Sequence, residues 1–173
     1  FTSHNRTEYR SFHYSRRYFQ WLAKLNYQNA QYYKPSINMI FGIGTDILEI
    51  KRISKISNKY GEKFINRIYG SNEITIIKNK NNDLDNFLSK RFAAKEATWK
   101  AFNPKRGTGL IFKEIETLNH QNGKPYLFFS GKMERYVKEK EKELSGKLKF
   151  DISISDERQY AIAFVVISLA PFD

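Results

Sequence analysis

Two short stretches of the chain carry side chains that fit together as one chemical site. The first, residues 41–46, reads FGIGTD and ends on the carboxylate of Asp46. The second, residues 91–101, reads RFAAKEATWKA and carries Glu96 and Lys100 one helical turn apart. Magnesium takes oxygen ligands, commonly one or two carboxylates together with water and substrate phosphates. Because a lysine adds a point charge for a phosphate, the pattern favours a divalent metal ion that holds a phosphorylated ligand.

Simpler interpretations of the same residues stay open. The glycines at positions 42 and 44 allow a ligand to approach the strand closely, but they also allow tight packing or a bulge. Asp46 could instead cap the helix that follows. Glu96 and Lys100 could form only an i,i+4 ion pair, which is worth about 0.2–0.5 kcal/mol at an exposed position.

The second stretch belongs to a helix predicted over residues 85–102, with Asp85 as its cap, since good helix formers fill its interior. At about 100° per residue, Glu96 and Lys100 fall between the aromatic and alanine bands, on the side that should face the fold. The opposite side carries Arg91, Lys95 and Thr98. Just beyond the helix, Gly107-Thr108-Gly109 offers backbone donors to phosphate oxygens, although so short a motif is weak evidence.

The remaining elements follow from hydrophobic periodicity and turn signals. The Asn122-Gly123 pair predicts a hairpin turn between two strands. Helices are predicted over residues 49–59, 63–69 and 131–145, with a further turn or helix from residue 71, and strands over residues 40–47, 111–118, 124–130, 148–155 and 160–169.

Length and composition set outer limits on the function. A chain of 173 residues with 40% hydrophobic residues is expected to form one folded domain. No apolar run of about 18 residues occurs, which excludes a membrane-spanning helix, and the absence of cysteine excludes disulfides and thiolate metal sites. The net charge of +12 favours an anionic partner (nucleic acid, an acidic protein, a phosphorylated cofactor or an anionic membrane surface), although a lysine-rich bulk composition explains it equally well.

Residues 1–38 differ from the rest, because they combine six basic residues with a single acid, Glu8. Such a leader is typical of an organelle transit segment, and an N-terminal helix packed through Tyr14, Phe19 and Trp21 is the alternative. We predict a leader over residues 1–38, trimmed from a longer precursor, and a compact domain over residues 39–173. With the lysine- and asparagine-rich composition, the leader suggests a plastid-like organelle such as an apicoplast, and a cytoplasmic location is the alternative.

Two segments resemble, in order and separation, the signature segments of the holo-acyl-carrier-protein synthase type of 4′-phosphopantetheinyl transferase. They are GIGTDILEIKRI at residues 42–53 and RFAAKEATWKAF at residues 91–102. Residues 107–109, 121–125 and 152–161 extend the likeness, which covers about residues 39–169. The two signatures together are highly specific for this family.

The resemblance implies a small α+β fold, with an antiparallel sheet packed on the long helix, that assembles as a homotrimer with coenzyme A between neighbouring subunits. It implies that the 4′-phosphopantetheine group moves from coenzyme A to a serine of apo acyl carrier protein, which leaves adenosine 3′,5′-bisphosphate and supports fatty acid biosynthesis. Asp46 and Glu96 match the Mg²⁺ ligands, and Lys100 matches the lysine near the pyrophosphate. Further contacts to coenzyme A are expected from Arg91, Lys95, Gly107, Thr108 and Gly109, and the acidic carrier is expected to dock on Arg52, Ile56 and Arg67. Glu96, directly or through a metal-bound water, is also the candidate base for the serine proton.

The chain departs from the family pattern at two places. Residues 103–106 form an insertion, where Lys105 or Arg106 either touches the 3′-phosphate of the nucleotide or lies in solvent. Asp156 stands where many relatives carry histidine, so no histidine role is carried over.

Two rival functions remain, a nucleic-acid-binding module and a metal-dependent phosphohydrolase. The first would need basic and aromatic side chains on one surface, and the basic helix at residues 49–59 lacks interleaved aromatics. We therefore expect neither nucleic acid nor a membrane as a partner.

Overall fold

The computed structural model describes residues 39–80, 82–105 and 107–172. The leader predicted over residues 1–38 lies outside the described residues, so the predicted domain division stays a prediction. In chain order the elements are β1 (Met39–Glu49), α2 (Ile50–Tyr60), α3 (Glu62–Ile68), α4 (Ser71–Lys78), α5 (Leu84–Phe102), the 3₁₀ turn η1 (Phe112–Glu114), β2 (Ile115–Asn119), β3 (Pro125–Phe129), α6 (Gly131–Glu143), β4 (Gly146–Glu157) and β5 (Tyr160–Pro171).

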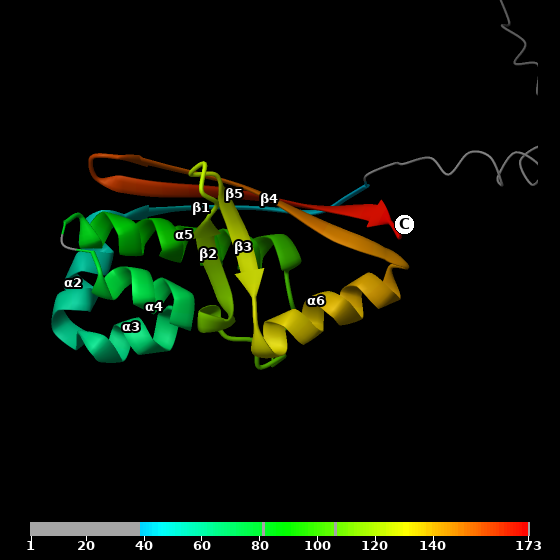
Figure 1. Cartoon of the computed structure of the whole chain (residues 1–173), viewed down its shortest axis with the longest axis horizontal. Helices are drawn as coiled ribbons and strands as arrows, with labels where there is room; N and C mark the ends of the chain where they lie inside the picture. Colours follow the sequence, from blue (N-terminus) through cyan, green and yellow to red (C-terminus); the bar gives the residue numbers. More distant parts are fainter. Residues whose placement is uncertain (1–38, 81, 106, 173) are drawn as a thin grey trace, which may run out of the picture. The chain divides into compact units, whose positions relative to one another are not determined.

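A three-stranded antiparallel sheet in the order β1-β5-β4 forms one layer (Figure 1). Its central strand, β5, alternates between buried and more exposed residues from Tyr160 to Ile167, and one face carries four side chains with 0% exposure: Ala161, Ala163, Val165 and Ile167. The intervening residues Ile162 and Phe164 are 41% and 44% exposed on the other face. This period of two gives the sheet an inner face that packs on helices and an outer apolar face that no described residue covers.

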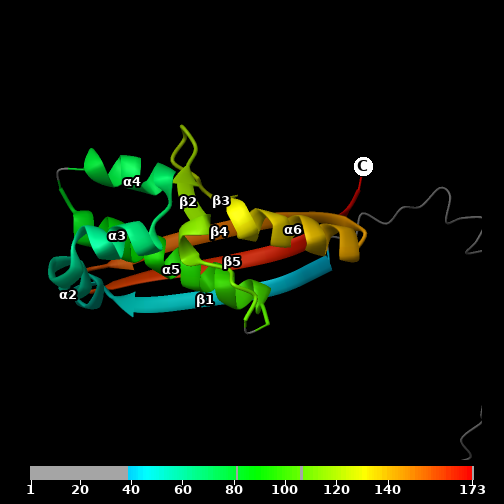
Figure 2. The same ribbon diagram turned by 90° about the horizontal axis from the view of Figure 1, so that it is seen from below.

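Helix α5 lies along the inner face, in contact with β1 and β5 (Figures 1 and 2). The approach is close, because a Cβ added at Gly44 would lie 1.9 Å from the carbonyl oxygen of Ala97, and one at Gly42 would lie 2.1 Å from that of Ala101. The packing interpretation of these two glycines is therefore confirmed. The close approach also sets Asp46, two residues further along β1, beside the helix.

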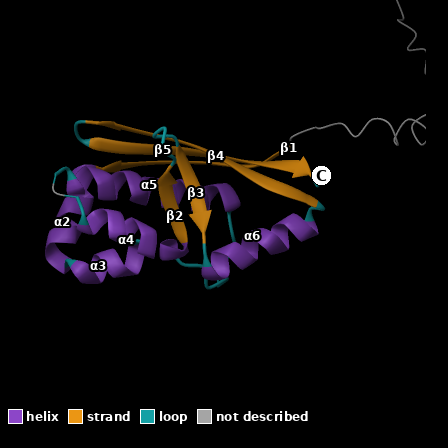
Figure 3. Cartoon of the chain, viewed as in Figure 1, coloured by secondary structure: helices purple, strands orange, loops and turns teal. Residues whose placement is uncertain are grey.

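The other elements cover the two ends of α5. Helices α2, α3 and α4 gather at its N-terminal end, while α6 lies near its C-terminal end, and all of these helices lie on the inner side of the sheet (Figures 1 and 3). A second antiparallel sheet is the β2–β3 hairpin, as the Asn122-Gly123 turn predicted. At the C-terminal end of α5, the ring of Phe102 packs at centroid distances of 5.7–6.1 Å against Phe41, Phe129, Tyr136 and Phe150.

The predicted fold class, an antiparallel sheet packed on a long helix in an α+β fold, is confirmed. Two local predictions are wrong. The strand predicted over residues 111–118 begins as the 3₁₀ turn η1, so only β2 is extended. The N-cap position of α5 is Asp83, which has a left-handed backbone with φ of 59° and makes no side-chain cap bond, whereas Asp85 lies inside the first turn.

Within the described residues, no helix is both long enough and apolar enough to span a bilayer.

Candidate active site

The three residues predicted from the two signature stretches come together at one place. Asp46 comes from β1, and Glu96 and Lys100 come from α5. The Nζ of Lys100 lies 2.8 Å from Oδ1 of Asp46 and donates a second hydrogen bond, 3.0 Å long, to the carbonyl oxygen of Thr45. In the described part of the chain, Lys100 is ion-paired with Asp46 rather than with Glu96, so the helix-only ion pair considered above does not form.

The carboxyl group of Glu96 lies in an environment that disfavours its charge. Its partial burial raises its pKa most, and the negative charge of Asp46 raises it further, while Lys100 opposes both effects. A lone carboxylate would avoid such a position, because desolvation and a neighbouring like charge both cost free energy. A bound cation would remove this cost, since it attracts both carboxylates at once.

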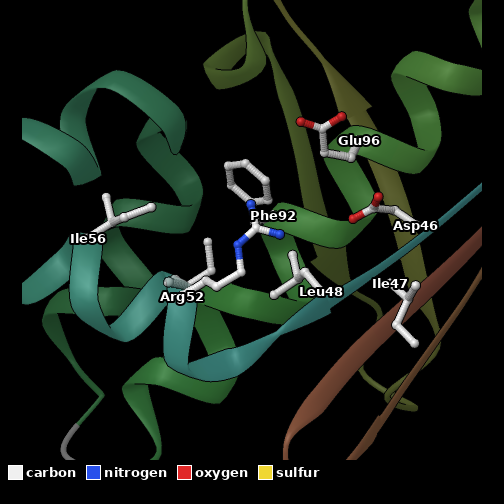
Figure 4. A pocket seen from close by; sticks show the side chains of 8 residues that line it. Asp46, Ile47, Leu48, Arg52, Ile56, Phe92 and Glu96 are labelled. Atoms are coloured by element: carbon white, nitrogen blue, oxygen red, sulfur yellow. The ribbon is translucent and has the colours of Figure 1, made fainter.

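Asp46 and Glu96 line a cavity of about 250 Å³ between β1, α2 and α5. Figure 4 shows the two acidic side chains together on one side of this cavity, with Ile56 at the other. The remaining lining residues are Ile47, Leu48, Arg52, Ile53 and Phe92. The cavity therefore joins a doubly acidic side to apolar walls and one guanidinium group.

The donor set fits a magnesium ion that shares its ligands with a substrate. Among residues 39–80, 82–105 and 107–172, no cluster of three or more histidine, cysteine, aspartate or glutamate residues could hold a metal ion, so an ion at this site would take Asp46 and Glu96 together with water or substrate oxygens. Mg²⁺ is commonly held by one or two carboxylates plus water and phosphate oxygens. Because burial and the charge of Asp46 raise the pKa of Glu96, a cation between the two carboxylates would stabilise the charged form of Glu96.

The alanine band of the long helix is buried as predicted, but its predicted outer side is wrong. Lys95 and Thr98 have 0% exposure and Arg91 has 7%, whereas Lys100 is exposed. The side assigned to the exterior therefore packs against other elements. The reason is that α5 is covered on two sides, by the sheet and by the α4–η1–β2 region, so polarity alone does not identify its buried face.

The burial of Lys95 contradicts the predicted contact between this side chain and coenzyme A. Its ammonium group forms a 2.6 Å ion pair with Glu73 and also donates to the backbone carbonyls of Phe112 and Ile115. All three protons of the amine thus have acceptors inside the protein. Arg91 donates to Oδ1 of Asn119 at 2.5 Å and lies over the Phe87 ring, so it too is separate from the Asp46–Glu96 cavity.

The Gly107-Thr108-Gly109 turn lies beyond the end of α5 and is exposed. Gly107 and Gly109 have φ angles of 84° and 68°, in the left-handed region that favours glycine. The turn does not line the cavity that holds Asp46 and Glu96. Its predicted contact with the nucleotide is untested, as is that of Lys105 in the insertion; Arg106 lies outside the described residues.

Comparison with known proteins identifies the family. The family model of the 4′-phosphopantetheinyl transferase superfamily matches residues 42–165. The chain belongs to this superfamily. It is 44% identical over 131 residues to the holo-[acyl-carrier-protein] synthase of Orientia tsutsugamushi, covering 75% of this chain and 98% of that one.

Solved structures agree with this assignment. A holo-(acyl-carrier-protein) synthase from Bacillus anthracis, in complex with CoA (3′,5′-ADP), is 35% identical with a TM-score of 0.58, and the match covers 75% of this chain and 97% of that one. Holo-ACP-synthase from Plasmodium yoelii is 32% identical with a TM-score of 0.63, and the match covers 79% of this chain and 98% of that one.

The transferase also has a groove beside the acidic cavity. The groove measures about 450 Å³ and is lined by Ile56, Tyr60, Lys63, Phe64, Arg67 and Ile68. Ile56 lines both the groove and the cavity, and Arg52 lines the cavity. The three residues predicted to receive the carrier protein, Arg52, Ile56 and Arg67, therefore lie along one continuous surface of α2 and α3.

Asp156, at the tip of the β4–β5 hairpin, has a role that sequence reasoning did not identify. Its carboxylate accepts hydrogen bonds from Asn86 at 2.7 Å and from Lys90 at 2.9 Å. These bonds lower the pKa of Asp156 below its usual value, and the bond from Asn86 has the larger effect. In this transferase the residue ties the hairpin to the first turns of α5, and no short-range sequence signal joins positions 70 residues apart.

Gly44→Ala is expected to destabilise the transferase and to disturb the approach of Asp46 to α5. The new Cβ would lie 1.9 Å from the backbone oxygen of Ala97, so β1 and α5 must separate, and overpacking of this kind costs about 1–3 kcal/mol. Thermal unfolding measures this loss. Thr45→Val, whose side chain points to the opposite exposed face, is the matched control, and an unchanged Tm for Gly44→Ala would contradict the close packing.

The stability of the metal-free transferase is expected to depend on pH through Glu96. Because the folded-state pKa of Glu96 is raised, chiefly by burial and then by Asp46, the contribution of this group is fully present below its unfolded pKa and is lost as pH rises through its folded pKa. Glu96→Gln should therefore gain stability relative to the wild type as pH rises from about 4. Urea unfolding at several pH values tests this, and a pH-independent difference would contradict it.

Proposed function

We propose that this transferase is a holo-acyl-carrier-protein synthase, which moves 4′-phosphopantetheine from coenzyme A to a serine of apo acyl carrier protein. The supporting observation is that Asp46 and Glu96 line one cavity, with Lys100 ion-paired to Asp46, and that this cavity shares Ile56 with a groove that also carries Lys63 and Arg67. The named relatives give the substrate class. In this assignment Asp46 and Glu96 hold Mg²⁺, and Lys100 faces the pyrophosphate.

The reaction is a displacement at phosphorus. The serine oxygen forms a bond to the β-phosphorus of coenzyme A, the bond from that phosphorus to the bridging oxygen breaks, and adenosine 3′,5′-bisphosphate leaves with the electron pair. When bound, Mg²⁺ neutralises charge on the pyrophosphate oxygens. Lys100 adds a positive charge beside the same oxygens, and Glu96 accepts the serine proton.

The carrier protein docks on α2 and α3 in this proposal. Acyl carrier proteins are acidic, and the groove offers an apolar floor at Phe64 and Ile68 with Lys63 and Arg67 at its rim. A positive rim speeds encounter with an acidic partner and fixes its orientation. Because Ile56 lines both hollows, a carrier helix in the groove would hold its serine close to the acidic cavity.

We also infer a homotrimer in which a neighbouring subunit covers the outer face of the sheet. This face exposes Ile43, Ile47, Ile162 and Phe164, each more than 40% accessible, and a large contiguous apolar patch marks an interaction site. A cavity of about 250 Å³ is also smaller than the range of about 300–1,000 Å³ for ligand pockets, which supports a coenzyme site completed by a neighbour. Light scattering should give three times 20.5 kDa, and a monomer retaining full activity would refute this assembly.

Incubation with coenzyme A, Mg²⁺ and apo acyl carrier protein tests the reaction. The carrier should gain the mass of one phosphopantetheine group, and EDTA should prevent the gain. Release of phosphopantetheine without an acceptor would instead favour the phosphohydrolase, and tight, salt-sensitive RNA binding without any mass gain would favour the nucleic-acid-binding module.

Two observations favour different cellular locations. The basic leader at residues 1–38 motivates import into a plastid-like organelle such as an apicoplast, whereas the Orientia relative is a bacterial protein and fits a cytoplasmic enzyme better. Fusion of residues 1–38 to a fluorescent reporter tests the first proposal. Diffuse cytoplasmic fluorescence of the full precursor would reject it.

A further inference from the structure

A second group of charged residues lies inside the protein and does not line the acidic cavity. Lys95 and Glu73 form a 2.6 Å ion pair, and both side chains have 0% exposure. Glu73 also accepts hydrogen bonds from the backbone N–H groups of Gly70 at 3.1 Å and Thr117 at 3.0 Å. The pair thereby joins α4, α5 and the start of β2.

Stability alone is a weak reason for such a pair. Removing two charges from water is costly, and apolar residues of similar volume often stabilise a core as well or better. What the pair provides is fixed geometry, because a buried charge tolerates few arrangements of its partners. Glu116 reinforces that geometry, since its 2% exposed carboxylate accepts the N–H groups of Asn72 at 2.8 Å and Glu73 at 3.0 Å.

On α5, Lys95 is the neighbour of the proposed metal ligand. Lys95 immediately precedes Glu96, and adjacent residues point about 100° apart around a helix. With the Lys95 amine held by Glu73 and by the carbonyls of Phe112 and Ile115, α5 has little freedom to rotate. That rotation decides whether the Glu96 carboxylate faces the cavity shared with Asp46.

The same anchor also holds a wall of the cavity. The ring of Phe112 contacts Phe92 and Trp99 edge-on, at centroid distances of 5.9 and 5.6 Å. Phe92 lines the cavity beside Glu96. The carbonyl of Phe112 accepts a hydrogen bond from Lys95 at 3.2 Å. One buried ammonium therefore fixes both the η1 turn and helix α5, against which the η1 turn packs.

We propose that the buried Lys95–Glu73 pair is a positioning device, which fixes the rotation of α5 so that Glu96 and Asp46 converge on one divalent cation. This inference rests on the proposed function for the identity of the cation. Lys95 and Glu73 are positioning residues rather than catalytic ones, because both side chains have 0% exposure and their charged groups are paired inside the protein. Loss of the pair should lower the affinity for the metal ion more than it lowers the rate of the chemical step.

The test is a double variant, Lys95→Met together with Glu73→Met, which removes both charges and keeps the volume. Lys95→Met alone leaves an unpaired buried carboxylate and is expected to fold poorly; the double variant avoids this. Mn²⁺ alone, followed by electron paramagnetic resonance, should bind the double variant about 10–100-fold more weakly, as for other residues that orient a metal ligand. The Mg²⁺ concentration for half-maximal activity should rise in parallel, with a smaller change in kcat at saturating Mg²⁺.

Val137→Ala, a buried truncation on α6 away from the cavity, is the control for general loss of stability. It should lower Tm without changing Mn²⁺ affinity. Wild-type Mn²⁺ affinity in the double variant would overturn the proposal, and so would an equal loss of affinity in Val137→Ala. The metal measurement uses no carrier protein, so it is independent of the transfer reaction. If the wild type fails to modify the carrier while the double variant still binds Mn²⁺ more weakly than the wild type, the transfer reaction is refuted and the positioning role stands.

Discussion

Glu96→Gln is expected to lower kcat by on the order of 10²–10³-fold or more, which is the size of the loss when one group that stabilises transition-state charge is removed. The amide keeps the shape of the side chain but cannot supply a negative ligand or accept the serine proton. The fold should survive, because the carboxylate lies in an environment that already disfavours its charge. Mass spectrometry of the carrier measures turnover, and Mn²⁺ binding measures the site directly.

Glu139→Gln is the matched control for this change. Glu139 is exposed on α6, and its loss should leave both turnover and metal binding unchanged. If Glu96→Gln transfers phosphopantetheine at close to the wild-type rate, Glu96 is neither the base nor a needed ligand. If it binds Mn²⁺ normally but does not turn over, the proton-accepting role survives and the ligand role does not.

Arg52→Glu is expected to lower kcat/KM for the carrier about tenfold to a hundredfold, mainly through slower association. The reversed charge repels an acidic partner at the mouth of the cavity, and Arg67→Glu should act in the same direction from the far side of the groove. Binding of coenzyme A should change much less. Titration calorimetry with each partner separates the two effects, and the defect should shrink at high salt because screening weakens interactions between exposed charges.

Arg135→Glu, an equal charge reversal at an exposed position on α6, controls for the change in net charge. It should leave carrier binding close to the wild type. Equal losses of carrier and coenzyme A affinity in Arg52→Glu would place this arginine in the coenzyme site instead. A loss in Arg135→Glu as large as in Arg52→Glu would mean that net charge, rather than the α2–α3 surface, attracts the carrier.

Much of the architecture could be predicted because local signals agreed with the tertiary structure. The helix predicted over residues 85–102 and the turn at Asn122-Gly123 both formed where expected. The strand predicted over residues 111–118 was shortened by the η1 turn, whose Phe112 ring contacts Phe92 and Trp99 on α5. That contact joins residues far apart in the chain, so alternation within the segment carried no trace of it.

Composition and spacing are enough to identify the groups available for chemistry. They are two carboxylates and a lysine, in two stretches whose composition fits a strand and a helix. Which sides of α5 are buried depends on the elements that pack against it, and these are fixed by the tertiary structure. Because α5 is covered on two sides, its polar pattern assigned Lys95 to the wrong face; the ammonium is buried only because Glu73 and two backbone carbonyls, from other elements, accept its protons. A buried charge is stable only where ion-pair and hydrogen-bond partners lie beside it. When those partners are distant in the sequence, the fold brings them together and local spacing does not reveal them.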